Sequence, residues 1–324
     1  MLALLGRRAL AGAMVVAGVV TLTFFLVQLA PGDPVERLLG PTATAAQLAA
    51  QRRALGLDRP LGAQYVIWLG RFARGDWGRS IATGRPVRAL LGAAVPATVT
   101  LVGASLVLSY LLGLAVGAWQ AAADPRIDTT LSIITVTLFA LPGYWLGLML
   151  VVAFTYWAHW LPAFGAAGLD ADALTGWSRL ADRLRHLVLP LATLTLTGVG
   201  GAARFVRGAM RDVLRQPFVR TAEAKGLSPF QITRRHVARN ALIPVITLLG
   251  LSLPALFSGA VFVEAVFAWP GVGRRLVEAV QARDYPVVMA ATVVTAGLVV
   301  IGNLLADACA AWTDPRTRRG REET

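Results

Sequence analysis

RTAEAKGLSPFQITRRHVARN, residues 220–240, is a basic stretch that lies between two long apolar runs. Gly226 follows a helix-forming segment, as the glycine after a helix C-terminus usually does. Ser228 and Gln231 have the spacing of a capping box, and Pro229 occupies the first helical position after the cap. Upstream, Pro217 interrupts the helical pattern. The sequence therefore predicts that the loop 206–240 is an ordered helix-turn-helix with a tight glycine corner.

Outside this loop the chain is apolar. Of its 324 residues 56% are hydrophobic and 15% are charged, whereas a soluble domain carries about 25% charged residues. Six runs without Asp, Glu, Lys or Arg are long enough to cross a bilayer, which takes about 20 residues. Such long runs suit helices and not barrel strands. We expect an all-α integral membrane protein with six spans, at residues 10–30, 96–119, 131–157, 187–205, 241–262 and 286–307.

The third region, 131–157, contains Pro142-Gly143 and has two interpretations. A hairpin turning at this dipeptide would leave only 12 residues, 130–141, on its first arm, about half of what a span needs. Transmembrane helices tolerate proline. We therefore expect one span that is kinked at Pro142.

Arginines set the expected orientation, because basic residues concentrate in the loops that stay inside. Arg7 and Arg8 place the N-terminus in the cytoplasm, and six spans return the basic C-terminal tail to the same side. The first apolar run is interpreted as a retained span and not a cleaved signal peptide. The predicted segments are a cytoplasmic N-terminus 1–9, the first span 10–30, a large extracytoplasmic loop 31–95, a five-helix core 96–310 that includes the cytoplasmic loop 206–240, and a cytoplasmic tail 311–324.

From its residues alone, the 206–240 loop has three interpretations. It could lie on anionic lipid as a basic juxtamembrane linker, or dock on another protein through the small residues Ala222, Ala224 and Gly226. Binding to DNA is disfavoured, because spans tether both helices and neither can enter a major groove. We therefore expect lipid bilayer and protein partners and no nucleic acid, despite the net charge of +13.

The same stretch resembles the cytoplasmic EAA loop of ABC-importer permeases, in the branch that imports peptides and nickel. Other blocks of this family's pattern follow in order along nearly the whole chain: LAPGDP at 29–34, LGLDRPLGAQYVIWLGRFARGDWGRSIATGRPV at 55–87, LPGYWLGLML at 141–150, VFAWPGVGRRLVEAVQARDYPVV at 266–288 and DPR at 314–316. The general importer pattern has glutamate six residues before the glycine. Here that position is Arg220, and Glu223 falls in the middle. The peptide branch shares this departure, which argues against a glutamate salt bridge as the chief docking contact.

The resemblance implies a type I importer permease that forms half of a translocation path in the bacterial inner membrane. Its partners would be ATP-binding-cassette ATPase subunits, a second homologous permease and an extracytoplasmic solute-binding protein. The cargo would be peptides, with nickel chelates, glutathione or oligosaccharides as the alternative. The implied ATPase-docking residues are Arg220, Thr221, Ala222, Glu223, Ala224, Lys225, Gly226 and Leu227, with Ser228, Pro229 and Gln231 shaping the corner.

The sequence offers no catalytic residues of its own. A phosphate-binding Gly-x-x-x-x-Gly-Lys-Ser/Thr loop is absent, and the only lysine is Lys225 in the docking loop. Cys309 is the only cysteine, so a cysteine-based metal cluster is excluded. We expect no enzyme activity, cofactor or metal site. The residues that line the path and the identity of the cargo are left open by the sequence, as is whether the outside loop 31–95 packs at the outer mouth or serves as a plug against the other permease.

Overall fold

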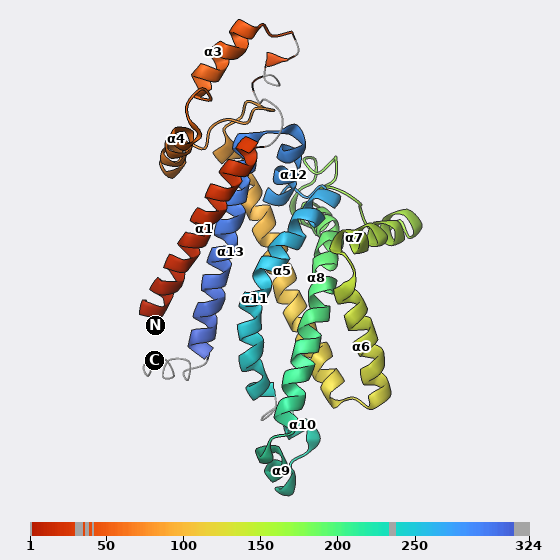
Figure 1. Cartoon of the computed structure of the whole chain (residues 1–324). Coiled ribbons are helices and arrows are strands. Elements are labelled where there is room, and N and C mark those ends of the chain that lie inside the picture. The colour runs from red at the N-terminus through yellow and green to blue at the C-terminus, as the bar shows by residue number, and fades with distance from the viewer. Residues whose placement is uncertain (1, 30–34, 36–38, 41, 233–237, 314–324) are drawn as a thin grey trace. The chain divides into compact units, whose positions relative to one another are not determined.

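The computed structural model describes residues 2–29, 35, 39–40, 42–232 and 238–313, and these residues are almost entirely helical. Within these residues, Arg79 and Pro86 form an isolated antiparallel β-bridge. The prediction of an all-α chain is confirmed (Figure 1). The elements are α1 (Leu2–Leu29), α3 (Ala45–Leu55), α4 (Leu61–Ala73), α5 (Val87–Ala122), α6 (Pro125–Ala140), α7 (Gly143–Val151), the π-helix η1 (Val152–Trp157), α8 (Gly176–Leu214), α9 (Pro217–Ala224), α10 (Pro229–Ile232), α11 (Ala238–Val266), α12 (Val272–Ala282) and α13 (Tyr285–Thr313).

Each of the six predicted spans lies on one of these helices or on a bent pair of them. Within the described residues, α1, α5, α8 and α13 each contain a stretch that is long and apolar enough to cross a membrane, and α6 followed by α7 and η1 forms a bent pair that passes together. The predicted span 241–262 lies on α11, of which Ser252–Val266 is the apolar stretch. The blocks at 30–34 and 314–316 lie outside the described residues.

The third span is bent more sharply than the sequence predicts. Leu141 has extended φ/ψ angles of −70° and 132°, as expected of a residue that precedes proline. A new helix then begins at Gly143, and the two helices meet at 102°. The predicted break at Pro142 is therefore in the right place, and the kink is a sharp bend between two helices.

The chain divides into two compact units. Within the unit that contains Val99–Trp269, α8 contacts α6 and the part of α5 after Val99. A Cβ atom added at Gly113 would lie 2.5 Å from the Cβ of Ala202, and one at Gly117 would lie 2.8 Å from the Cβ of Val206. From the first contact to the second, the residue number rises by four on each helix, so α5 and α8 run parallel. Parallel neighbouring spans require an odd number of crossings between them, which favours a single crossing for residues 125–157 over a hairpin.

Glycines provide the close approach between helices. At several glycines, an added Cβ atom would lie within 4 Å of an atom of another helix or of the turn that follows that helix. These glycines are Gly113, Gly117, Gly147, Gly198, Gly200 and Gly201. Small residues at such positions let transmembrane backbones approach each other.

The second unit contains Gly12–Thr98 and Pro270–Leu298. Its core joins the start of α5 to α12 and α13, with Val87, Leu91, Val272 and Ala291 almost fully buried. The predicted outside loop 31–95 contains the helices α3 and α4. Tyr65 on α4 shares a 2.7 Å hydrogen bond with a threonine of α1. This loop is therefore structured in its described part.

Candidate functional site

The 206–240 loop begins as a continuation of α8. This helix has 39 residues, so at 1.5 Å per residue it is about 58 Å long and exceeds the bilayer core of about 30 Å. Its last residues, 206–214, are the first part of the 206–240 loop. After a short break α9 begins at Pro217, the proline that interrupts the helical pattern of the sequence. In Figure 1, α9 and α10 lie together beyond this end of α8.

Gly226 forms the corner of the loop. Its φ is +77°, in the left-handed region that favours glycine. The amide of Leu227 donates a 3.3 Å hydrogen bond to the carbonyl oxygen of Ala222, and the amide of Lys225 donates one of 3.1 Å to Thr221. The first bond closes a Schellman-type turn. The predicted glycine helix end is confirmed.

Ser228 starts the next helix as a capping box. The Gln231 amide donates a 3.3 Å hydrogen bond to the Ser228 hydroxyl oxygen. In return, the Ser228 amide donates a 3.1 Å bond to the Gln231 side-chain oxygen. Pro229 is the first residue of α10. The predicted continuation through 233–237 lies outside the described residues, and α11 begins at Ala238.

An apolar cluster, which we call the loop core, lies beneath the corner. It is formed by Val206, Met210, Val219, Ala222, Ile232 and Val245. Tyr110 and Leu114 of α5 pack against the same cluster. The loop core therefore joins α9 and α10 to the ends of α8 and α11 and to α5. This packing holds the loop as an ordered body on the membrane helices.

The opposite side of the loop is open. Phe218, Arg220, Ala224 and Lys225 are exposed, and so is the Gly226 backbone, where an added Cβ would meet nothing within 4 Å. Thr221 is exposed as well, and Leu227 is half-buried. The side chain of Glu223 is outside the described residues.

The assignment of Ala222 to the exposed small-residue surface is wrong, because only 6% of this residue is accessible. Ala222 lies three residues after Val219 and five before Leu227 on the inner side of the turn, where all three contribute to or contact the loop core. An i, i+3 spacing places side chains on one helix face. Among the predicted small residues, Ala224 and Gly226 remain available to a partner.

An ion cluster around the buried Asp128 joins α6 to the α8 part of the loop, and sequence reasoning missed it. Asp128 on α6 accepts hydrogen bonds from Arg207 at 2.5 Å (Nε) and 2.6 Å (Nη2) and from Arg211 at 2.9 Å (Nη2). A signal was present, since Arg207 and Arg211 are four residues apart on one helix face. Their partner, however, lies 79 residues from Arg207 in sequence, which spacing along one helix cannot reveal.

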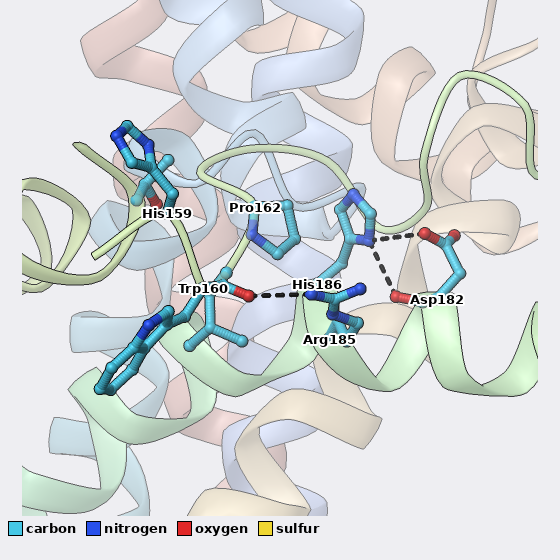
Figure 2. Close-up of a pocket in the computed structure, with 8 residues that line it drawn as sticks. His159, Trp160, Pro162, Asp182, Arg185 and His186 are labelled. Atoms are coloured by element: carbon cyan, nitrogen blue, oxygen red, sulfur yellow. Dashed lines mark hydrogen bonds and ion pairs between the residues drawn. The ribbon is translucent and has the colours of Figure 1, made fainter. Parts of the chain in front are cut away.

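A cavity of about 360 Å³ lies where η1 and the following turn meet the start of α8 (Figure 2). His159 and His186 both line it. The His186 Nδ1 lies 2.8 Å from the Asp182 carbonyl oxygen, and Arg185 donates a 3.0 Å bond to the Trp160 carbonyl. Figure 2 shows these side chains turned toward their own backbone partners. The arrangement ties the 158–175 segment to α8 and carries no evident chemistry.

The described residues contain no group of three or more His, Cys, Asp or Glu side chains that could hold a metal ion. His236 lies outside the described residues.

Family comparisons cover almost the full length. A family described as binding-protein-dependent transport system inner membrane component matches residues 109–319, and the N-terminal model of the same kind of membrane component matches residues 1–102.

Similar curated proteins are named as peptide permeases. The chain is 37% identical to the oligopeptide transport system permease protein AppB of Bacillus subtilis, over 96% of this chain and 97% of that protein. It is 39% identical to the probable D,D-dipeptide transport system permease protein DdpB of Escherichia coli, over 96% of each. It is also 37% identical to the di/tripeptide permease DppB of Pseudomonas aeruginosa, over 94% and 95%.

Solved structures share the fold at lower identity. An inward-facing MetNI methionine ABC transporter matches with a TM-score of 0.59 and 18% identity, over 71% of this chain and 98% of that one. An amino acid ABC transporter with histidines matches with a TM-score of 0.53 and 13% identity, over 68% and 93%.

Proposed function

Because the chain belongs to the binding-protein-dependent transport system inner membrane component family, and is thus an importer permease and not an enzyme, we propose that its 206–240 loop couples it to a separate ATPase. The docking surface is the exposed side of the corner: Arg220, Thr221, Ala224, Lys225 and Gly226. Glu223 and Leu227 border it, and Ala222 supports it from within. Ser228, Pro229 and Gln231 keep the corner in shape.

The observation that carries this proposal is the two-sided construction of the loop. Its inner side packs into the loop core with α5, α8 and α11, while its outer side exposes small and basic residues. A linker that only rests on lipid has no need of a buried core or a glycine corner. An element that must pass displacement to the spans does need both, since a flexible segment would absorb the movement.

The partners that we propose are ATPase subunits, a second homologous permease and an extracytoplasmic binding protein. In the proposed topology residues 1–9, 206–240 and 311–324 face the cytoplasm, following the concentration of arginine in those segments. Residues 10–30 form the first span, 31–95 lie outside, and 96–310 form the core of the path in the inner membrane.

The proposed cargo is a peptide. Support comes from the relatives, whose names refer to oligopeptides, di- and tripeptides and D,D-dipeptides. Nickel chelates, glutathione and oligosaccharides are the alternatives. Mechanistically, ATP-driven closure of the ATPase pair brings the two permease loops together, the attached spans tilt, and the path opens outward. Hydrolysis resets it, in an alternating-access cycle of rigid bodies.

Co-expression with the neighbouring permease, ATPase and binding-protein genes tests the proposal. The chain should co-purify with ATPase subunits, and their ATP hydrolysis should rise when the peptide-loaded binding protein is added. The chain purified alone should hydrolyse no ATP. A lone chain with catalytic turnover, or ATPase subunits that bind equally well after deletion of residues 217–232, would reject the assignment.

A further inference from the structure

We propose that Asp128, Arg207 and Arg211 form a clamp that makes α6 move together with α8 whenever the 206–240 loop is displaced. The inference rests on the proposed coupling function. The three residues are positioning residues, since they hold α6 against α8 and contact no cargo. These three residues are called the Asp128 clamp below.

The clamp is a bidentate ion pair with a second arginine. Arg207 Nε and Nη2 donate to the two carboxylate oxygens of Asp128 at 2.5 and 2.6 Å, and Arg211 Nη2 adds a bond of 2.9 Å. The Asp128 side chain is only 9% exposed, against 27% for Arg207. Bidentate pairing is directional as well as strong. All three bonds form in one register of α6 against α8, so sliding of either helix breaks them.

The clamp and the loop core share one segment of α8. Val206 and Met210, which are 1% exposed, contribute to the loop core. Arg207 and Arg211 are their immediate neighbours in sequence and reach α6. Residues 206–211 therefore join the cluster that holds α9 and α10 through one pair of side chains and contact α6 through the other. A displacement of the loop reaches both helices through fewer than two helical turns.

Further contacts join α6 and α8 along their length. An added Cβ at Gly200 would collide with the carbonyl oxygen of Thr135, and Phe139 lies against Gly200 and Gly201. The Arg204 guanidinium lies 4.8 Å from the centre of the Phe139 ring. With the clamp in place, α6 is attached to α8 at its start and along its length. Without it, the start of α6 near the loop loses its charged attachment.

Stability alone does not account for this choice of residues. Buried ion pairs are often no more stabilising than apolar residues of similar volume. What a bidentate pair adds is a preferred register, which is the property required of two helices that must move as one body.

A distance measurement tests the clamp in the complete complex with ATPase, second permease and binding protein. In a Cys309→Ala background, spin labels at Thr130 on α6 and Gly208 on α8, both exposed, report the separation of the helices. We expect the same distance distribution without nucleotide and with ATP plus vanadate. In Asp128→Asn the two distributions should differ. A nucleotide-dependent distance in the unsubstituted complex, or no difference in Asp128→Asn, would overturn the proposal.

The functional readout is peptide uptake per ATP hydrolysed in vesicles, with radiolabelled trialanine as the probe. Asp128→Asn should lower this ratio by about tenfold, a size typical of coupling between sites. The matched control is Asp307→Asn, because Asp307 also pairs with an arginine, Arg8, at 2.6 Å, and neither belongs to the loop core. If uptake and hydrolysis fall together at an unchanged ratio, or ATPase subunits are lost, Asp128 acts on folding or docking and the clamp is rejected.

The double variant Asp128→Cys, Arg207→Cys provides a second test of the clamp that does not rely on Asp128→Asn. The ratio should be low before treatment and should recover after a short bis-maleimide joins the two thiols, while a cross-link that leaves the ratio low rejects the clamp. Absence of ATPase subunits from the unsubstituted complex would instead reject the proposed function. Absence of trialanine uptake alone would reject only this cargo, and the distance measurement would still decide on the clamp.

Discussion

Asp128 and Asp284 are both nearly buried carboxylates, at 6% and 2% exposure, yet different donors satisfy them. Asp128 pairs with two arginines of another helix. Asp284 accepts bonds from the Ser80 hydroxyl at 2.5 Å and from the amides of Ile81 and Ala82 at 3.1 and 3.2 Å.

The difference concerns what each carboxylate holds in place. The donors to Asp284 are three consecutive residues, so this carboxylate fixes the shape of one turn. The donors to Asp128 are long charged side chains one helical turn apart, so this carboxylate fixes the register of two helices.

The largest loss in the free energy of unfolding is expected for Arg207→Ala. It removes two of the three hydrogen bonds that the arginines donate to Asp128 and leaves a buried carboxylate poorly compensated, at a cost of about 3 kcal/mol. Arg8→Ala breaks an ion pair whose arginine is half exposed and should cost less than about 1 kcal/mol. Unfolding of the two variants in detergent measures the difference. Equal losses would show that burial does not distinguish the two pairs.

A smaller loss is expected for Asp284→Asn. The amide nitrogen cannot accept a hydrogen bond, so the turn at residues 80–82 loses part of its charge-assisted bonding, worth about 2 kcal/mol. Uptake per ATP should stay close to that of the unsubstituted complex, because this carboxylate holds only a turn. A fall in that ratio as large as for Asp128→Asn would remove the functional distinction between the two carboxylates.

Gly226→Val should cost about 1 kcal/mol, from strain of a β-branched residue at a φ of +77°. Uptake should nevertheless fall severely, because the new side chain projects from the docking surface. The control is Gly208→Val, a helical site where an added Cβ also meets nothing within 4 Å. Near-normal uptake by Gly226→Val would reject the docking hypothesis. Lipid-surface binding predicts instead that neutralising Arg234 and Arg235 together does the damage.

The smallest effect on stability, within about 0.5 kcal/mol, is expected for single cysteines at the exposed positions Ala82, Ala173, Ala224 and Gln281 in a Cys309→Ala background. An impermeant thiol reagent on intact cells should label every site except Ala224. That result would place the Asp284 turn outside and the docking loop inside. Labelling at Ala224 would overturn the orientation.

Features set by neighbours in sequence were predictable. The Gly226 corner and the Ser228–Gln231 capping box depend on residues within five positions of one another, and both have the expected hydrogen bonds. The positions of the spans follow from the cost of placing charge in lipid. The family resemblance, carried by blocks along the whole chain, agrees with the comparisons.

Long-range packing decided the rest. The sequence could not show that Ala222 turns inward, because that depends on Val206 and Ile232 meeting it in the loop core. Nor could it show the 102° bend after Leu141, since a proline breaks a helix without setting the angle. The two partners of Asp128 were equally hidden, because the approach of α6 to α8 selects Arg207 and Arg211 from the many arginines of the chain. Local hydrogen bonding and hydrophobicity thus determine which segments are helices and where they turn, whereas contacts between residues far apart in the chain determine which side of each helix is buried and which charges meet.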